Sequence, residues 1–439
     1  MVRSGPVKCI PPPNARRRRR SRLFRGLLLV LLFDGAAAGS AHSAAVDDTP
    51  ASAVVMISMD GVRPSEVAPE LLPSLVELAE RGARAERLIP EFPTNTFPNH
   101  VTLVTGVAPE RHGIVDNAFI DPILGSFEKR EIPAWIEVQP LWSLLADRGM
   151  VSASFYWVGS EGDWRDRGGP RYWRPFSSET PEREKVEQIL EWLDLPPADR
   201  PRLVTSWFRG ADHAGHVYGP GSPQVAEQLR AQNAAVESLV AGVRARGLWR
   251  STTLIFVSDH GMTSASRRVD LGSALREAGV SATVIGIGGT ASVYLGAPAP
   301  GAADRARSVE VARGLGLSAW TRAEAPSGLR VGHRRFGDVV VVAPVGTAIV
   351  REGLTLEGFH GYPPAAPEMS AILVAAGRRV PAGVILPPIR SVDVAPTVLS
   401  LLGIPAPAWM EGTPIAAFEP ETPKAMSAGS KASPKRSSK

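Results

Sequence analysis

The 439-residue chain has almost no cysteine and no long apolar run, and both absences restrict what it can be. Its single cysteine, Cys9, lies near the N-terminus, so disulfides and thiolate-held metals are excluded from the rest of the chain. The clearest apolar run, Leu27–Phe33, has seven residues, whereas a membrane-spanning helix needs about 20. No other run is long enough. We therefore expect a mature chain without a transmembrane span that is stabilised by its hydrophobic core.

A basic surface is also absent from the part of the chain that is expected to fold. The formal net charge is +5, but residues 1–45 contribute +8 and residues 420–439 contribute +4. Residues 46–419 therefore carry −7, which excludes the basic footprint of a nucleic-acid-binding protein. No stable complex with nucleic acid is expected, and the composition leaves the oligomeric state open.

The two ends of the chain differ from the rest. Arg16–Arg20, with Arg22 and Arg25, precede the apolar run, and small residues follow it up to Ala45. This order predicts a signal peptide over residues 1–45, and therefore a periplasmic or extracellular protein. Export without disulfides is typical of a bacterial envelope protein. The last residues, 419–439, are rich in Pro, Ser and Lys, and a disordered tail is expected there.

Apolar strands and amphipathic helices alternate through most of the chain. The expected strands are Val54–Ser58, Val151–Tyr156, Leu203–Phe208, Thr252–Ser258 and Ser370–Ala376. The expected helices are Leu71–Arg81, Asn99–Thr105, Leu141–Arg148, Pro181–Leu193, Pro223–Arg246 and Val392–Leu402. Such alternation predicts an α/β fold with a mainly parallel sheet that helices cover on both faces.

The pattern changes within residues 269–357. Shorter β-like runs (Ala282–Ile287, Ala291–Leu295 and Val339–Ala343) surround one helix near Ala302–Leu315. We interpret this segment as a small inserted α/β cap subdomain. Residues 46–268 and 358–418 then form the catalytic domain.

One stretch, Pro93–His100, contains a candidate nucleophile. Pro98 favours a first helical turn, and Gly106 ends the helix that follows. A hydroxyl just before a helix N-terminus lies beside free backbone N–H groups, where an anion such as a phosphoryl group is stabilised. Thr94 or Thr96 can equally be a simple helix cap. The stretch alone does not decide between a cap and a nucleophile.

Three aspartates follow predicted strands, namely Asp60, Asp212 and Asp259. Ligands bind at this edge of an open parallel sheet. Histidines lie near these acids in Asp212-His213-Ala214-Gly215-His216, in Asp259-His260 and in Gly358-Phe359-His360. Any single member of the set is explained by a turn, a cap or a structural role. Together, oxygen and imidazole donors without thiolates predict a catalytic zinc site.

With these motifs in place, the chain resembles the nucleotide pyrophosphatase/phosphodiesterases of the alkaline phosphatase superfamily. The resemblance covers roughly residues 52–415. The motifs appear in family order: Met59–Gly61, Pro93–His100, His112–Asn117, Asp212–His216 with Gly219-Pro220, Ser258–Met262 and Gly358–Tyr362.

This resemblance implies an alkaline-phosphatase-like fold and two Zn²⁺ per chain. One zinc would be held by Asp212, His216 and His360, and the other by Asp60, Asp259 and His260 together with Thr96. Thr96 would attack phosphorus and form a phosphothreonine, while Asn117 and the Thr96 N–H would hold a phosphoryl oxygen. Hydrolysis of this intermediate from the opposite side would give net retention at phosphorus. The other histidines (His100, His112, His213 and His333) have no ligand role in the motifs and are expected to be structural or at the surface.

The expected substrate is a small nucleotide-like phosphodiester or phosphoanhydride. By the same resemblance, Phe97 and Tyr172 are the candidate substrate-binding aromatics, the latter in a pocket wall formed with Phe155–Glu161, although these aromatics can equally be ordinary packing. No Arg or Lys in the motifs is placed for the extra charge of a monoester, which favours diesters. The alternatives are a phosphonate or phosphomonoester hydrolase with two metals, and a binding protein with a vestigial site. A serine hydrolase is disfavoured because no G-x-S-x-G stands before a suitable His.

Overall fold

The structure is a computed structural model that describes residues 52–127, 129, 132–162, 164, 167–296 and 301–418. The predicted signal peptide of residues 1–45 and the predicted disordered tail of residues 419–439 lie outside the described residues. Among the described helices, none is both long enough and apolar enough to cross a membrane.

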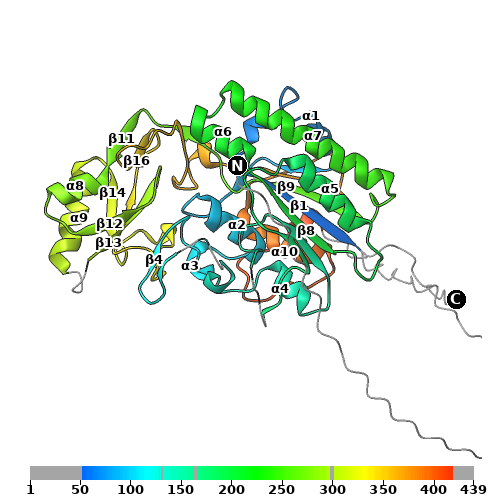
Figure 1. Cartoon of the computed structure of the whole chain (residues 1–439), viewed down its shortest axis with the longest axis horizontal. Helices are drawn as coiled ribbons and strands as arrows, with labels where there is room; N and C mark the ends of the chain where they lie inside the picture. Colours follow the sequence, from blue (N-terminus) through cyan, green and yellow to red (C-terminus); the bar gives the residue numbers. More distant parts are fainter. Residues whose placement is uncertain are drawn as a thin grey trace, which may run out of the picture. The chain divides into compact units, whose positions relative to one another are not determined.

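A sheet of eight strands forms the centre of this part of the chain (Figure 1). Its strand order is β19-β2-β18-β9-β1-β8-β6-β7. All neighbouring pairs are parallel except those that involve β18, which is antiparallel to β9 and to β2. The prediction of a mainly parallel sheet is confirmed. The strands are β1 (Ala53–Met59), β2 (Ala83–Ala85), β6 (Ser152–Phe155), β7 (Tyr172–Arg174), β8 (Leu203–Phe208), β9 (Thr252–Val257), β18 (Leu373–Gly377) and β19 (Val384–Leu386).

Helices cover both faces of this sheet, as predicted (Figure 1). One face carries α1 (Pro73–Glu80), α5 (Glu182–Leu193), α6 (Gly210–Tyr218) and α7 (Pro223–Ala245), and α7 contacts the other three. The other face carries α2 (Thr96–Thr105), α3 (Pro109–His112), α4 (Leu141–Ala146) and α10 (Val394–Leu401). The central strands β1, β8 and β9 are buried along their whole length, which explains their continuous apolar sequences.

Local sequence explains where the longest helix begins. Pro223 occupies the first turn of α7, and the Ser222 side chain accepts a hydrogen bond from Val225 N at 3.3 Å. The sequence did not predict α6, which follows β8 after a single residue. Its two glycines, Gly210 and Gly215, weaken the helical signal.

Residues 267–350 contain a second, smaller sheet with its own hydrophobic core. Its strand order is β12-β13-β15-β14, and every pair is antiparallel. Side chains such as Leu271, Val293 and Val341 fill its core. The elements are β11 (Arg267–Asp270), α8 (Leu271–Glu277), β12 (Ala282–Ile285), β13 (Thr290–Leu295), α9 (Ala302–Gly314), β14 (Ser318–Thr321), β15 (Val339–Val342) and β16 (Thr347–Val350). They lie to one side of the main sheet in Figure 1. The strands and the helix expected in this segment are present, while the limits of a cap subdomain at 269 and 357 stay a prediction.

Short strand pairs complete the described part. β3 (Leu88–Ile89) pairs with β20 (Ile389–Arg390), and β4 (Ile120–Asp121) pairs with β5 (Gly125–Ser126). β10 (Thr263–Ser264) pairs with β17 (Gly358–Phe359) at the point where the chain returns from the smaller sheet.

Candidate active site

The chain folds so that the predicted acids and histidines meet at the carboxyl edge of the main sheet. Asp60 directly follows β1, and Asp259 lies two residues beyond the end of β9. β8 leads into α6, which carries Asp212 in its first turn and His216 one turn later. Because residues four apart lie on the same face of a helix, these two side chains point the same way. His360 follows β17.

The structure brings six of these residues together as two groups of three. We call Asp60, Asp259 and His260 the Asp60 group, and Asp212, His216 and His360 the Asp212 group. Within each group, one potential ligand atom per residue lies within 4.8 Å of the others. The two groups adjoin, since the rings of His260 and His360 stack at 3.8 Å.

Thr96 borders the Asp60 group. It is the first residue of α2, and its Oγ1 lies 3.2 Å from His260 Nε2. The Nε2 atom also lies 3.2 Å from Asp259 Oδ2 and 3.6 Å from Asp60 Oδ1. Asn95 occupies the N-cap position, and no side chain caps this helix. The cap interpretation of Thr96 therefore finds no support in the geometry.

The three histidines share one orientation. His216 Nδ1 lies 2.8 Å from Gly358 O, His260 Nδ1 lies 2.9 Å from Gly261 O, and His360 Nδ1 lies 2.8 Å from Asn95 Oδ1. Since these oxygens only accept hydrogen bonds, each Nδ1 carries the proton. Each Nε2 then presents a lone pair to the group, as a metal-ligating imidazole does.

The arrangement fits a bound cation in each group. The Nε2 lone pairs of His216 and His360 face each other across 3.1 Å, which is repulsive without a cation between them. One oxygen of each acid is buried without a hydrogen-bond partner among the described residues: Asp60 Oδ1, Asp212 Oδ1 and Asp259 Oδ2. Buried polar atoms are normally satisfied, so these oxygens indicate a missing ligand.

The electrostatics agree with this fit. Burial, and then the charges of Asp259 and Asp212, raise the pKa of Asp60 well above its usual range. Burial, and then the charges of His260 and His216, lower the pKa of His360 well below its usual range. Carboxylates and imidazoles gathered in this way stabilise a divalent cation, which removes the repulsion among them. Nitrogen and oxygen donors without sulfur suit zinc.

Asn117 lies beside the N-terminus of α2. Its Oδ1 accepts a hydrogen bond from Phe97 N at 2.7 Å, which leaves its amide nitrogen for a ligand. The N–H of Thr96 is one of the first groups of the helix, which have no partner within the helix itself. These are the two donors to which the family resemblance assigns a phosphoryl oxygen.

A second layer of residues holds the ligands, and the sequence analysis assigned it no role. Asn95 joins His360 to Asp116, since its Nδ2 donates to Asp116 Oδ1 at 2.7 Å. Trp207 Nε1 donates to Asp60 Oδ2 at 2.8 Å. Asn95 and Asp116 lie inside recognised motifs, and Trp207 lies near the end of the buried strand β8, five residues before Asp212. These positions are the features of the sequence that could have identified the three residues as supports of the site. Burial raises the pKa of Asp116 to about 7.

A pocket of about 340 Å³ opens over Thr96. Its walls include Phe97, Asn117, Lys129, Phe176, Trp207 and Arg209, together with members of both groups. Lys129 and Arg209 lie outside the motifs, which explains why no cation was predicted here. We call this the central pocket.

Tyr172, predicted to bind the substrate, is not among the residues that line the central pocket, and its role stays a prediction. It belongs to β7, the outermost strand of the sheet, and its ring stacks on Trp192 with centroids 6.4 Å apart. Phe176, four residues later, reaches the pocket instead and stacks on Trp207 at 5.5 Å. Tyr172 lies within β7 at the sheet edge, whereas Phe176 lies beyond the end of that strand. The sequence pattern alone does not show this difference.

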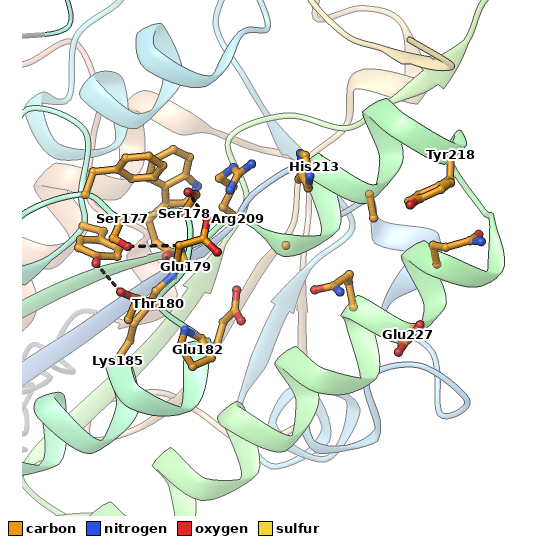
Figure 2. A pocket seen from close by; sticks show the side chains of 18 residues that line it. Ser177, Ser178, Glu179, Thr180, Glu182, Lys185, Arg209, His213, Tyr218 and Glu227 are labelled. Carbon is orange, nitrogen blue, oxygen red and sulfur yellow. Dashed lines mark hydrogen bonds between the residues drawn. The ribbon is translucent and has the colours of Figure 1, made fainter. Parts of the chain in front are cut away.

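A second pocket of about 490 Å³ adjoins the central one through Phe176, Trp207 and Arg209 (Figure 2). Figure 2 shows Lys185, Arg209, Glu179, Glu182 and Glu227 around it. We call it the side pocket. It borders no member of the two groups.

The remaining histidines take other positions. His100 lies against Thr96 O at 2.9 Å, and His112 lies against Thr102 Oγ1 at 3.1 Å. His213 lines the side pocket. His333 was expected at the surface, but it is half-buried and lies 3.2 Å from Glu137, a residue of the main body.

Known proteins resemble this chain in sequence and in fold. The family profile described as type I phosphodiesterase / nucleotide pyrophosphatase matches residues 54–363. An uncharacterised pyrophosphatase/phosphodiesterase of Schizosaccharomyces pombe is 38% identical over 223 residues, which are 49% of this chain and 46% of that protein. An ectonucleotide pyrophosphatase/phosphodiesterase of Caenorhabditis elegans is 28% identical over 384 residues, which are 84% of this chain and 49% of that protein. The chain thus spans less than half the length of either relative.

This chain matches a larger share of a solved structure than of these two relatives. Murine ectonucleotide pyrophosphatase/phosphodiesterase 5, as an inactive threonine-to-alanine variant in complex with AMP, matches with a TM-score of 0.75 and 27% identity. The match covers 81% of this chain and 96% of that one. The resemblance expected from the order of the motifs is confirmed. The chain belongs to the type I phosphodiesterase / nucleotide pyrophosphatase family.

Proposed function

We propose that the protein hydrolyses phosphodiester or phosphoanhydride bonds of nucleotide-like substrates, with two Zn²⁺ ions and a phosphothreonine intermediate. The observation that carries the proposal is the position of Thr96, whose Oγ1 lies 3.2 Å from His260 at a helix N-terminus beside both groups. A threonine hydroxyl is a weak nucleophile, so it needs such surroundings to react.

Asp60, Asp259 and His260 would hold one ion beside Thr96, and Asp212, His216 and His360 would hold the other. Bound zinc would lower the pKa of the hydroxyl and of a water molecule, and it would neutralise charge that develops on the phosphoryl oxygens.

The residues of the chain divide the reaction between them. Thr96 Oγ1 attacks phosphorus, a Thr96–phosphorus bond forms, the bond to the leaving oxygen breaks, and the hydroxyl proton passes through solvent to the leaving oxygen. Asn117 Nδ2 and the Thr96 N–H stabilise the phosphoryl oxygens. Water then attacks from the opposite side, which restores the Thr96 hydroxyl and releases a phosphate monoester. The two inversions give retention at phosphorus.

The central pocket suits the organic group that stays on the phosphorus. Phe97 and Phe176 provide aromatic walls for a nucleobase, while Lys129 lies 4.6 Å from the centre of the Phe97 ring. AMP is the ligand named for the murine relative, which supports a nucleotide.

The closest rival is a two-metal phosphonate or phosphomonoester hydrolase, since Lys129 and Arg209 supply positive charge near the pocket. Hydrolysis of thymidine 5′-monophosphate p-nitrophenyl ester should exceed that of p-nitrophenyl phosphate. Faster turnover of the monoester would refute the diesterase proposal. Export to the periplasm or outside the cell belongs to the same proposal, and a relative described as venom phosphodiesterase from Macrovipera lebetinus is consistent with it.

The test of the mechanism compares Thr96→Ala, Thr96→Ser and Thr105→Ala. Thr96→Ala should keep its zinc and lose turnover by several powers of ten, while Thr96→Ser should retain part of it. Thr105→Ala is the control, because this hydroxyl bonds only to Val101 O within the same helix. A chelator should abolish hydrolysis, and added zinc should restore it. Turnover that survives Thr96→Ala or chelation would contradict the mechanism.

A further inference from the structure

A third pocket, of about 220 Å³, borders the Asp212 group but not the Asp60 group. Its walls include His216 and His360 of the Asp212 group, and Asn117, which it shares with the central pocket. Thr96, Phe97 and the members of the Asp60 group do not line it. We call it the distal pocket, because it borders the Asp212 group and is not lined by Thr96.

This position has a consequence for any displacement by Thr96. The attacking and leaving oxygens lie on opposite sides of phosphorus in an in-line displacement. Thr96 Oγ1 lies against His260 of the Asp60 group, so in the proposed displacement the leaving oxygen would depart toward the Asp212 group. Of the three pockets named so far, the central pocket and the distal pocket border the Asp212 group, and the side pocket does not.

The smaller sheet provides the apolar wall of the distal pocket. Ile285 and Ile287 line it, as does Leu356, which lies between β16 and β17. Side chains alternate between the two faces of a strand. In β12, Ala282 and Val284 pack on the second core, so Ile285 points away from that core. Ile285 is half-exposed, and it is not part of either hydrophobic core.

Charge separates the distal pocket from the side pocket. No lysine or arginine is among the described residues that line the distal pocket, and Asp116 adds a carboxyl group. The side pocket in Figure 2 contains several charged side chains and borders neither group. A negatively charged leaving group such as pyrophosphate therefore finds no lysine or arginine among the described walls of the distal pocket and only the ion proposed at the Asp212 group as a counter-charge, whereas an uncharged apolar one finds a matching wall.

We propose that the distal pocket binds the leaving group and that Ile285 selects an uncharged, apolar alcohol over pyrophosphate. The proposal rests on the proposed function and defines its substrate class. Diesters of nucleotides with alkyl or aryl alcohols are then better substrates than nucleoside triphosphates.

The experiment uses the full chain loaded with zinc and a series of thymidine 5′-monophosphate alkyl esters, from ethyl to hexyl, with thymidine triphosphate. The leaving alcohols have similar basicity, so chain length changes mainly the buried apolar area. The wild-type kcat/KM should rise at least several-fold along the series. In Ile285→Asn this rise should disappear. In Ile285→Lys the ratio of triphosphate to hexyl-ester turnover should increase at least tenfold.

Thr283→Asn is the matched control, because Thr283 is exposed, lies on the same face of β12 and does not line the pocket. It should keep the wild-type rise. An unchanged rise in Ile285→Asn, or an equal loss in Thr283→Asn, would overturn the inference while leaving the proposed function intact. If the wild-type protein hydrolysed none of these substrates, the proposed function itself would fail.

Discussion

The hydroxyl of Thr96 lies against His260, a residue 164 positions further along the chain. Local sequence allows Thr96 to be either a helix cap or a nucleophile. Only its contacts with residues distant in the sequence bear on which of the two it is. Thr94 shows the opposite outcome. Its Oγ1 donates to Tyr362 O at 2.7 Å and accepts from Gly361 N at 3.1 Å, so it holds the loop that carries His360. The two threonines of this motif therefore make different contacts, with Thr96 proposed as the nucleophile and Thr94 holding a loop.

At the same scale, His112 should make stability depend on pH. Its ring is fully buried, and burial lowers its pKa from 6.5 to about 3. Between these values the unfolded chain binds a proton that the folded chain does not, so stability falls as the pH drops. The contribution is complete above pH 6.5, and about 2 kcal/mol of it is lost by pH 5.

Urea unfolding at pH 7.5 and pH 5 measures this effect. Wild-type protein should lose more stability between the two values than His112→Gln. The comparison uses the difference within each protein, so a general destabilisation by the substitution does not affect it. An equal loss in both proteins would show that His112 is not the group responsible.

At the scale of elements, the contact of α6 with β17 sets the distance between His216 and His360. Gly215 and Gly358 allow this contact, since a Cβ on Gly358 would lie 2.3 Å from Gly215 O and 2.5 Å from Met262 Sδ. His216 Nδ1 also donates to Gly358 O at 2.8 Å. The Asp212 group therefore depends on two glycines that the motifs contain but whose role the sequence does not explain.

Gly358→Ala should force α6 and β17 apart and weaken zinc binding by the Asp212 group about 10–100-fold. Metal content after dialysis should fall from the proposed two zinc ions per chain toward one. Gly314→Ala provides the control, because a Cβ there meets no atom within 4 Å. Unchanged zinc content and affinity in Gly358→Ala would refute this role of the contact.

At the scale of the whole described chain, Arg335 links the smaller sheet to the main body. Its guanidinium group is 1% exposed and donates to Asp121 Oδ2, Gly113 O and Trp135 O at 2.7 Å each. Such a buried charge is stable only while its partners remain. The link also holds the loop after α3, which carries Asp116 and Asn117.

Arg335→Met should lower the free energy of unfolding by about 3–5 kcal/mol, because it leaves Asp121 buried without its main partner. Arg334→Met is the control, since Arg334 is 41% exposed and also contacts Asp121. It should cost no more than about 1 kcal/mol. Urea unfolding of both variants decides the matter, and equal effects would contradict the assignment.

The pattern of residues along the chain was enough to predict the class of the fold and most of its central elements. Continuous apolar runs such as Leu203–Phe208 must be buried on both faces of the sheet. The helical spacing of apolar residues, with a glycine shortly after the last turn, marks helices such as Pro223–Ala245. The sequence also predicted the residue types of the site, because oxygen and imidazole donors in ordered motifs have few other uses.

Which side chains lie together in one pocket depends on the tertiary structure. Tyr172 and Phe176 are four residues apart, yet β7 holds one at the sheet edge while the other enters the central pocket. The distal pocket takes Ile285 from the smaller sheet and His216 from α6. Such pairings arise from packing between segments distant in sequence, and no local pattern of residues encodes them.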